Sequence, residues 1–422
     1  MAYALFECVG IELEYMVVDP IHGGVLPMAD ALLQALALPD GGDTNPSDVT
    51  RGQVSWSNEL VNHVVELKVT DPVPSLKGCG DLFHQALREC QPQLDSLPVK
   101  LMPTAMHPLM NPAVETVLWP HEYREIYQTY HRIYDCYRHG WANVQSVHIN
   151  LPFRGDREFA VLHAAIRALL PLLPGLAAAS PIQEGRLTGI RDNRLIAYAG
   201  NSLRIPQATG QVIPEPITSE AEYDAIIMQP LYRAVLPHDP GKVLQHEFLN
   251  SRGAIARFDR GAIEIRLLDV QECPSMDIAI AEAVIHALRQ LVSLHWANRG
   301  AALNAIPTDL LRLHLDRAII DAEETRIDDA DYLRLLGLPG LHCPTLSDVW
   351  KYFTEKLSPE DRATSAGLDL LSREGTLATR IARTLPPCPD EDQIRTRYSG
   401  LCEHLMRNQP FSGLGTDASE AM

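Results

Sequence analysis

The chain has 422 residues, of which 46% are hydrophobic and 21% are charged, the proportions of an ordinary globular protein with a large core. Its formal net charge of −18 at pH 7 argues against a nucleic-acid partner, because a phosphate backbone requires a basic surface. The eight cysteines are scattered without a Cys-x-x-Cys pair, which favours reduced thiols and a cytoplasmic location.

The first hundred residues predict strands and helices bounded by turn residues. Polar and apolar residues alternate over 9–18, which predicts a strand. Glutamates interrupt this segment and no basic leader precedes it, so we expect no signal peptide. The elements expected next are a helix over 27–38, a loop over 39–47, strands over 54–56 and 63–70, and a helix over 75–94.

The middle of the chain carries two helical patterns. Aromatic residues recur at helical spacing over 117–141, which is more typical of a face packed on a core than of a stacking platform. Residues 159–179 are the most apolar stretch, but they include His163 and Arg167, so we expect a buried helix and no membrane span. The other elements expected are strands over 102–106, 146–151 and 262–267, an irregular segment over 180–216, and a helix over 276–297.

The sequence shows no internal repeat and no linker, so we expect one catalytic domain over residues 1–385, with helical elaboration from about residue 276. Residues 386–422 form a C-terminal extension that is rich in proline and then polar. We expect its last part, 412–422, to be disordered.

Four of the expected strands place polar side chains on one face. Because side chains alternate along a strand, residues two apart share a face. Two unit charges about 4 Å apart repel by roughly 4 kcal/mol at an effective dielectric near 20, so acids gathered on one sheet require cations. The pairs that share a face are Glu12 with Glu14, Glu66 with Lys68, His148 with Asn150, and Glu264 with Arg266.

These strands predict a metal site with oxygen-rich ligands. Any one of the acids could be solvent-facing, but Glu66 and Glu264 lie in aliphatic runs where an unpaired carboxylate is costly. Oxygen ligands favour Mg²⁺ or Mn²⁺, whereas zinc would prefer several histidines or cysteines. The candidate ligands are Glu12, Glu14, Glu59, Glu66, His148 and Glu264.

Hard cations held by carboxylates usually accompany a nucleoside triphosphate, yet the chain has no GxxxxGK[ST] loop and no GxGxxG after a strand. Arginines are then the expected phosphate ligands, because guanidinium groups contact phosphoryl oxygens at two points. The candidates are Arg266, Arg191, Arg194 and Arg204, each of which could instead form an ordinary ion pair.

These motifs together resemble the glutamate–cysteine ligase family, in particular its bacterial type 2 or carboxylate–amine ligase branch. The resemblance spans residues 7–385. It is carried by Gly10-Ile-Glu-Leu-Glu-Tyr15, by Glu59 and Glu66, by Ser146-Val-His-Ile-Asn150, by Arg191-Asp-Asn193, by Ile263-Glu-Ile-Arg266 with Leu268-Asp269, and by the segment Arg373 to Arg380.

The resemblance implies a fold of the α+β class, related to glutamine synthetase: a curved, mostly antiparallel sheet with a polar concave face, flanked by helices. It implies a ligase that uses ATP and Mg²⁺ to activate a carboxylate, that of glutamate, as an acyl phosphate for attack by an amine, as in glutathione biosynthesis. Arg266 and Arg191 would then be catalytic. Both, with Arg194 and Asn150, would bind the nucleotide.

Several points stay open. The branch often has His-x-His where this chain has Ser146-Val-His148, and no segment identifies the amine acceptor. A metal-dependent hydrolase could use the same acids on a bridging water, without ATP. A catalytically inactive member could keep the fold as a binding protein, and a homodimer is compatible with the sequence.

Overall fold

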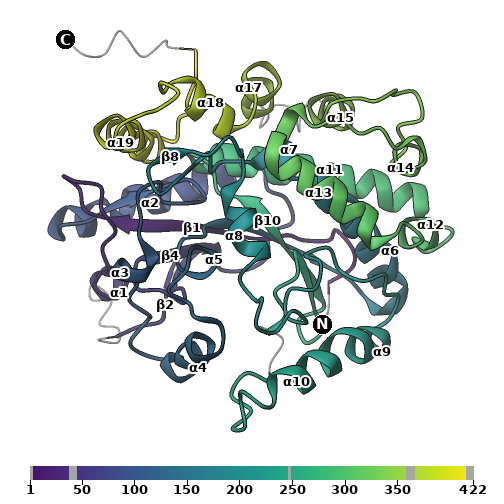
Figure 1. The fold of residues 1–422 in the computed structure, drawn as a ribbon, viewed down its shortest axis with the longest axis horizontal. Coiled ribbons are helices and arrows are strands. Elements are labelled where there is room, and N and C mark those ends of the chain that lie inside the picture. The colour runs from purple at the N-terminus through teal and green to yellow at the C-terminus, as the bar shows by residue number, and fades with distance from the viewer. Residues whose placement is uncertain (1–2, 38–44, 246–248, 358–365, 415–422) are drawn as a thin grey trace.

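The computed structural model describes residues 3–37, 45–245, 249–357 and 366–414. Within them the chain forms an α+β fold whose main sheet has eight antiparallel strands, flanked by helices (Figure 1). The order is β2-β3-β4-β1-β6-β10-β9, with β5 paired to β1. The strands are β1 (Gly10–Val18), β2 (Asp48–Arg51), β3 (Val54–Asn58), β4 (Val64–Val69), β5 (Lys100–Met102), β6 (Ser146–Pro152), β9 (Ala254–Arg257) and β10 (Ala262–Asp269).

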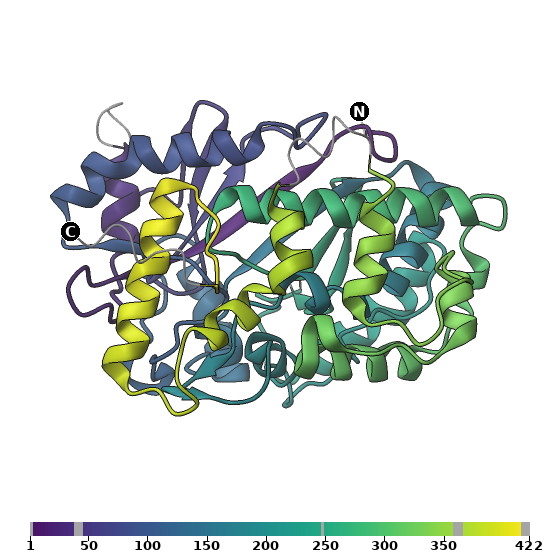
Figure 2. The same ribbon diagram turned by 90° about the horizontal axis from the view of Figure 1, so that it is seen from above.

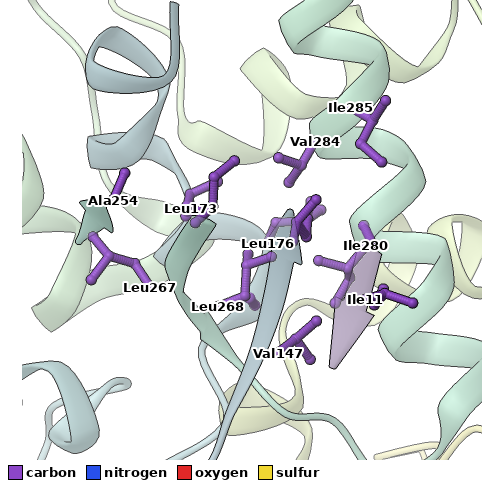
Figure 3. Packing of buried hydrophobic residues seen from close by; sticks show 14 of the residues in the cluster. Ile11, Val147, Leu173, Leu176, Ala254, Leu267, Leu268, Ile280, Val284 and Ile285 are labelled. Carbon is purple, nitrogen blue, oxygen red and sulfur yellow. The ribbon is translucent and has the colours of Figure 1, made fainter. Parts of the chain in front are cut away.

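The apolar face of this sheet packs against two long helices, α2 (Cys79–Ser96) and α11 (Pro274–His295). Figure 3 shows Ile11, Val147 and Leu268 of the sheet facing Ile280 and Val284 of α11. These side chains are at most 3% exposed, so the apolar half of each alternating strand forms the core. The antiparallel α+β architecture expected from the sequence is confirmed.

One described helix, α11, is long and apolar enough to cross a membrane. Most of its side chains are buried inside the protein, and the core helix of a globular protein has the same length and composition. We therefore describe α11 as the central core helix.

The C-terminal third is helical, and several of its helices, among them α12, α15 and α17, contact α11 (Figures 1 and 2). The packed helices continue beyond residue 385, where α19 contacts both α2 and β5. They are α12 (Ala301–Asn304), α13 (Thr308–Asp321), α14 (Ala330–Leu335), α15 (Leu346–Thr354), α17 (Ala366–Glu374), α18 (Leu377–Arg383) and α19 (Glu391–Arg407).

Two expected elements of the middle region are shorter than predicted. The strand predicted at 102–106 overlaps β5 (Lys100–Met102) only at Met102, and the helix predicted at 117–141 is reduced to α4 (Arg124–Tyr134) and α5 (His139–Ala142). Asp135 ends α4 with a left-handed φ of 58°, which a continuing helix cannot accommodate.

Other boundaries differ because of proline and short local pairing. The apolar stretch 159–179 contains the end of α6 (Gly155–Leu169), a 3₁₀ turn and α7 (Pro174–Ala177), divided where the prolines lack an N–H donor. The segment predicted as irregular at 180–216 contains the hairpin β7–β8 (Ile182–Gln183 and Arg186–Leu187) and α8 (Asn193–Ala199). Most of the loop 39–47 and of the tail 412–422 lies outside the described residues.

Helix α1 (Ala29–Ala37) packs against α2, β2 and β3. The remaining helices of the middle region are α3 (Pro112–Glu115), α4, α5, α8, α9 (Glu220–Tyr223) and α10 (Gln229–Val235), the last two joined by a π-helical turn. In Figure 1, α4 and α10 lie below the sheet and the C-terminal helices lie above it.

His163 in α6 makes the stability of the fold sensitive to acid. Burial and the charge of Arg167 lower the pKa of His163 to about 3, and neither ring nitrogen has a hydrogen-bond partner among the described residues. The unfolded chain takes up this proton near pH 6.5, so the free energy of unfolding should fall as the pH drops from about 6.5 towards 3, by up to about 1.4 kcal/mol per pH unit.

We expect His163→Leu to remove the contribution of one bound proton from this slope, without lowering the free energy of unfolding at pH 7.5. Urea unfolding at pH 7.5, 6.0 and 5.0 measures the difference. Equal slopes for the two proteins would contradict the burial of a neutral imidazole. The variant should keep part of the slope, because burial also lowers the pKa of His63 and of His107 to about 4.

Candidate active site

A cavity of about 930 Å³ covers the polar face of the sheet. Strands β1, β4, β6 and β10 form its floor, and α4, α5 and α8 contribute to its walls. All six predicted metal ligands line it. Its basic lining consists of Lys68, Arg194, Arg257, Arg260 and Arg266.

Strand register brings the acids together. Glu12 lies between Lys68 on β4 and His148 on β6, and Glu14 lies opposite Glu66. On the next strand pair, Glu264 lies opposite Asn150. Residues as far apart in the chain as Glu12 and Glu264 therefore share one face, because four neighbouring strands are in register.

His148 lies at the centre of the polar cluster in this cavity. Its Nδ1 lies 2.9 Å from Glu12 Oε2 and 3.8 Å from Glu264 Oε1, and its Nε2 lies 2.9 Å from Ser146 Oγ. The Ser146 hydroxyl donates to Glu14 Oε2 at 2.9 Å. Imidazole and hydroxyl thus connect three carboxylates that would otherwise face one another directly.

Asn150 holds the other side of Glu12. Its Nδ2 donates to Glu12 Oε1 at 2.9 Å. Gly10 lies opposite Asn150, and a Cβ at residue 10 would approach the Asn150 Cβ to 3.0 Å, so glycine permits the close approach of these strands.

Two groups of side chains can each surround a cation. One is Glu12, Glu66 and His148, and the other is Glu14, Glu59 and Glu66. In each group, one ligand atom per residue lies within 4.8 Å of the others. Carboxylate oxygens with one imidazole suit Mg²⁺ or Mn²⁺, so these residues fit the expected metal.

The electrostatics of the pocket reflect this crowding. Burial and the charges of Glu14 and Glu66 raise the pKa of Glu59 well above its usual value, and burial and the charge of Glu12 raise the pKa of Glu66 to about 7. Burial opposes the imidazolium of His148, but the hydrogen bond to Glu12 and the charge of Glu14 raise its pKa to about 9. Burial likewise opposes the Glu12 carboxylate, yet the hydrogen bond and charge of His148 lower its pKa to about 2. A bound cation would relieve the repulsion among these groups.

Arg266 lies beside Glu264, with its Nε 3.2 Å from Glu264 Oε1. Arg257 on β9 reaches the other oxygen of the same carboxylate at 3.1 Å. The pairing of β10 with β6 shifts register between Ile265 and Leu268, and such a bulge re-aims side chains next to a site. Arg266 therefore stands at the irregularity in the strand.

The three arginines of the 180–216 segment take different positions. Arg194 lines the cavity, but its guanidinium is bound within the protein, to Asp269 Oδ1 at 3.2 Å and to the Arg266 carbonyl at 2.8 Å. Arg191 donates its backbone N–H to Ile320 of α13, and Arg204 is exposed and bonded to backbone carbonyls in the last turn of α4. The roles predicted for Arg191, Arg194 and Arg204 stay predictions.

Four residues that the sequence analysis did not select contribute to this site. Ser57 and Lys68 contact Glu66, Ser146 contacts Glu14, and Arg257 contacts Glu264. For Lys68 and Ser146 the signal was present, since each shares a face with a selected residue. Arg257 lies on β9, a four-residue strand that the sequence pattern did not reveal.

Comparisons with known proteins give a consistent result. The sequence model of glutamate-cysteine ligase family 2 matches residues 8–326. An uncharacterized protein of Archaeoglobus fulgidus is 33% identical over 399 residues, which are 94% of this chain and 97% of that protein. A putative glutamate–cysteine ligase 2 of Bradyrhizobium sp. strain BTAi1 is 33% identical over 150 residues, which are 35% of this chain and 32% of that protein.

The fold is also similar to a solved structure. The crystal structure of glutamate–cysteine ligase from Francisella tularensis in complex with AMP superimposes with a TM-score of 0.55. The match covers 96% of this chain and 90% of that chain at 14% identity, a similarity of fold alone.

Proposed function

The chain belongs to glutamate-cysteine ligase family 2 and is a ligase that forms C–N bonds, and we propose that it uses ATP and Mg²⁺ to join the γ-carboxylate of glutamate to an amine. The observation that carries this proposal is the convergence of five glutamates and His148 in one cavity. The relative from Francisella tularensis, solved with AMP, supports the choice of nucleotide.

The proposed cation ligands are Glu12, Glu14, Glu59, Glu66, His148 and Glu264. Mg²⁺, or Mn²⁺ in its place, would neutralise phosphate charge when bound there. Asn150 and His148 keep the Glu12 carboxylate oriented into the cavity, and Ser146 does the same for Glu14.

In the proposed reaction the γ-phosphoryl group of ATP passes to a carboxylate oxygen of the donor, giving ADP and an acyl phosphate. The amine then attacks the activated carbonyl carbon, loses a proton and displaces inorganic phosphate. Arg266, whose side chain is 27% exposed towards the cavity, is the proposed contact of the transferred phosphoryl group. Catalysis depends on placement and charge, and needs no covalent intermediate on the protein.

We expect ADP, phosphate and an amide to form in equal amounts when the protein is mixed with ATP, Mg²⁺, glutamate and the correct amine. A panel of amino acids and small amines, with phosphate release and product mass as readouts, tests this. Folded protein that turns over no amine would contradict the ligase proposal. Phosphate or ester cleavage without ATP or amine would instead indicate the hydrolase.

A further inference from the structure

We propose that Lys68 and Ser57 are positioning residues that hold the Glu66 carboxylate where it serves both cation positions. This inference rests on the proposed function, because it concerns the metal ligands of the same cavity. It assigns a role to Ser57 of β3 and Lys68 of β4, which both donate hydrogen bonds to Glu66.

Glu66 is the ligand that the two cation positions share. It belongs with Glu12 and His148 in one group and with Glu14 and Glu59 in the other. Small rotations of its carboxylate would therefore disturb both positions at once. A shared ligand of this kind needs an orientation fixed from outside the cation positions.

Two donors fix that orientation from the side of β3. Ser57 Oγ donates to Glu66 Oε1 at 2.9 Å, and Lys68 Nζ donates to the same oxygen at 3.2 Å. Ser57 lies directly opposite Glu66 in the β3–β4 register, so its hydroxyl reaches the carboxylate without strain. Both bonds reach one oxygen, so they hold Oε1 of Glu66 against Ser57 and Lys68.

Lys68 has no donor left for a substrate. Its ammonium carries three N–H groups, and three acceptors surround it: Asp48 Oδ2 at 3.0 Å, Ser57 Oγ at 2.9 Å and Glu66 Oε1 at 3.2 Å. Asp48 lies opposite Ser57 on β2, so three adjacent strands supply these acceptors. Lys68 therefore acts through Glu66 and not on a bound anion.

Charge and position predict opposite effects for the loss of Lys68. A fixed positive charge next to a cation site weakens cation binding, so removing it should strengthen binding if charge were its only influence. If Lys68 orients Glu66, removing it should weaken binding. The sign of the change separates the two explanations.

The test is a titration of the full chain with Mn²⁺ alone, in which electron paramagnetic resonance reports free Mn²⁺. We expect Ser57→Ala and Lys68→Met each to weaken binding by roughly 10-fold or more, the usual cost of losing a residue that orients a ligand. Lys68→Arg should bind Mn²⁺ more tightly than Lys68→Met, because arginine keeps the charge and donors to the Glu66 carboxylate.

Lys77→Met is the matched control, since it removes the same charge from an exposed residue before α2 and should leave binding unchanged. Binding by Lys68→Met that equals or exceeds wild-type binding would overturn the inference. Should Lys68→Met fail to fold, Ser57→Ala decides the question, because it removes one hydroxyl and no charge. A wild type that binds no Mn²⁺ would instead count against the proposed metal site itself.

Discussion

Replacing Glu66 with glutamine should lower the rate of ATP-dependent amide formation by about 100-fold or more. Glu66 is the one side chain present in both candidate cation groups, and the amide oxygen of glutamine is a weaker ligand without charge. Losing several kcal/mol of transition-state stabilisation corresponds to a rate loss of this size. Phosphate release under saturating ATP, glutamate and amine measures the effect.

The stability of the same variant should not fall. Burial and the charge of Glu12 disfavour the ionised Glu66 carboxylate, so a neutral amide of the same shape relieves repulsion in the protein without metal. Glu7→Gln is the control, because Glu7 is exposed and should leave the rate unchanged. A Glu66→Gln protein with wild-type turnover would contradict the assignment of Glu66 to the cation site.

Replacing Arg380 with methionine should cost about 3–5 kcal/mol of the free energy of unfolding, because it leaves a buried carboxylate without its partner. Arg380 on α18 and Glu272 before α11 are both fully buried and paired, with Arg380 Nη2 lying 3.4 Å from Glu272 Oε2. Phe411, after α19, donates its backbone N–H to Glu272 Oε1 at 2.9 Å, and its carbonyl accepts from Arg380. Urea unfolding at pH 7.5 gives the change.

A double variant separates the loss of the pair from the loss of packing. We expect Arg380→Met with Glu272→Gln to be more stable than Arg380→Met alone, since the remaining side chain is then uncharged and still accepts from Phe411. The surface control is Arg334→Met, whose partner Asp331 is exposed, and its cost should stay below about 1 kcal/mol. An Arg380→Met protein as stable as this control would contradict the prediction.

This ion pair also gives a structural meaning to a motif of the C-terminal region. The segment from Arg373 to Arg380 joins α17 to α18 through Gly375, whose φ is +83° and where a Cβ would clash with Glu323 Oε1. Arg380 then ties α18 to the segment that follows β10, which carries Glu264 and Arg266. The motif therefore contributes to the helical packing that supports the sheet.

Much of the site was predictable because side-chain direction along a strand is local. A strand has a period of two, so Glu12 with Glu14 and Glu264 with Arg266 had to share a face wherever their strands lay. The aliphatic neighbours then required that the polar side chains have partners or cations. The sequence alone therefore determined which residues form the polar face, and it indicated the family through the order of those motifs.

Only the tertiary structure decided which strands are neighbours and in what register. The order β4-β1-β6-β10 places Glu12 between Lys68 and His148, and it results from packing distant apolar faces on α2 and α11. No short-range pattern encodes such contacts, because their free energy comes from burial between segments far apart in the chain. For the same reason the sequence could not reveal that Arg257 joins the cavity while Arg191 bonds to α13.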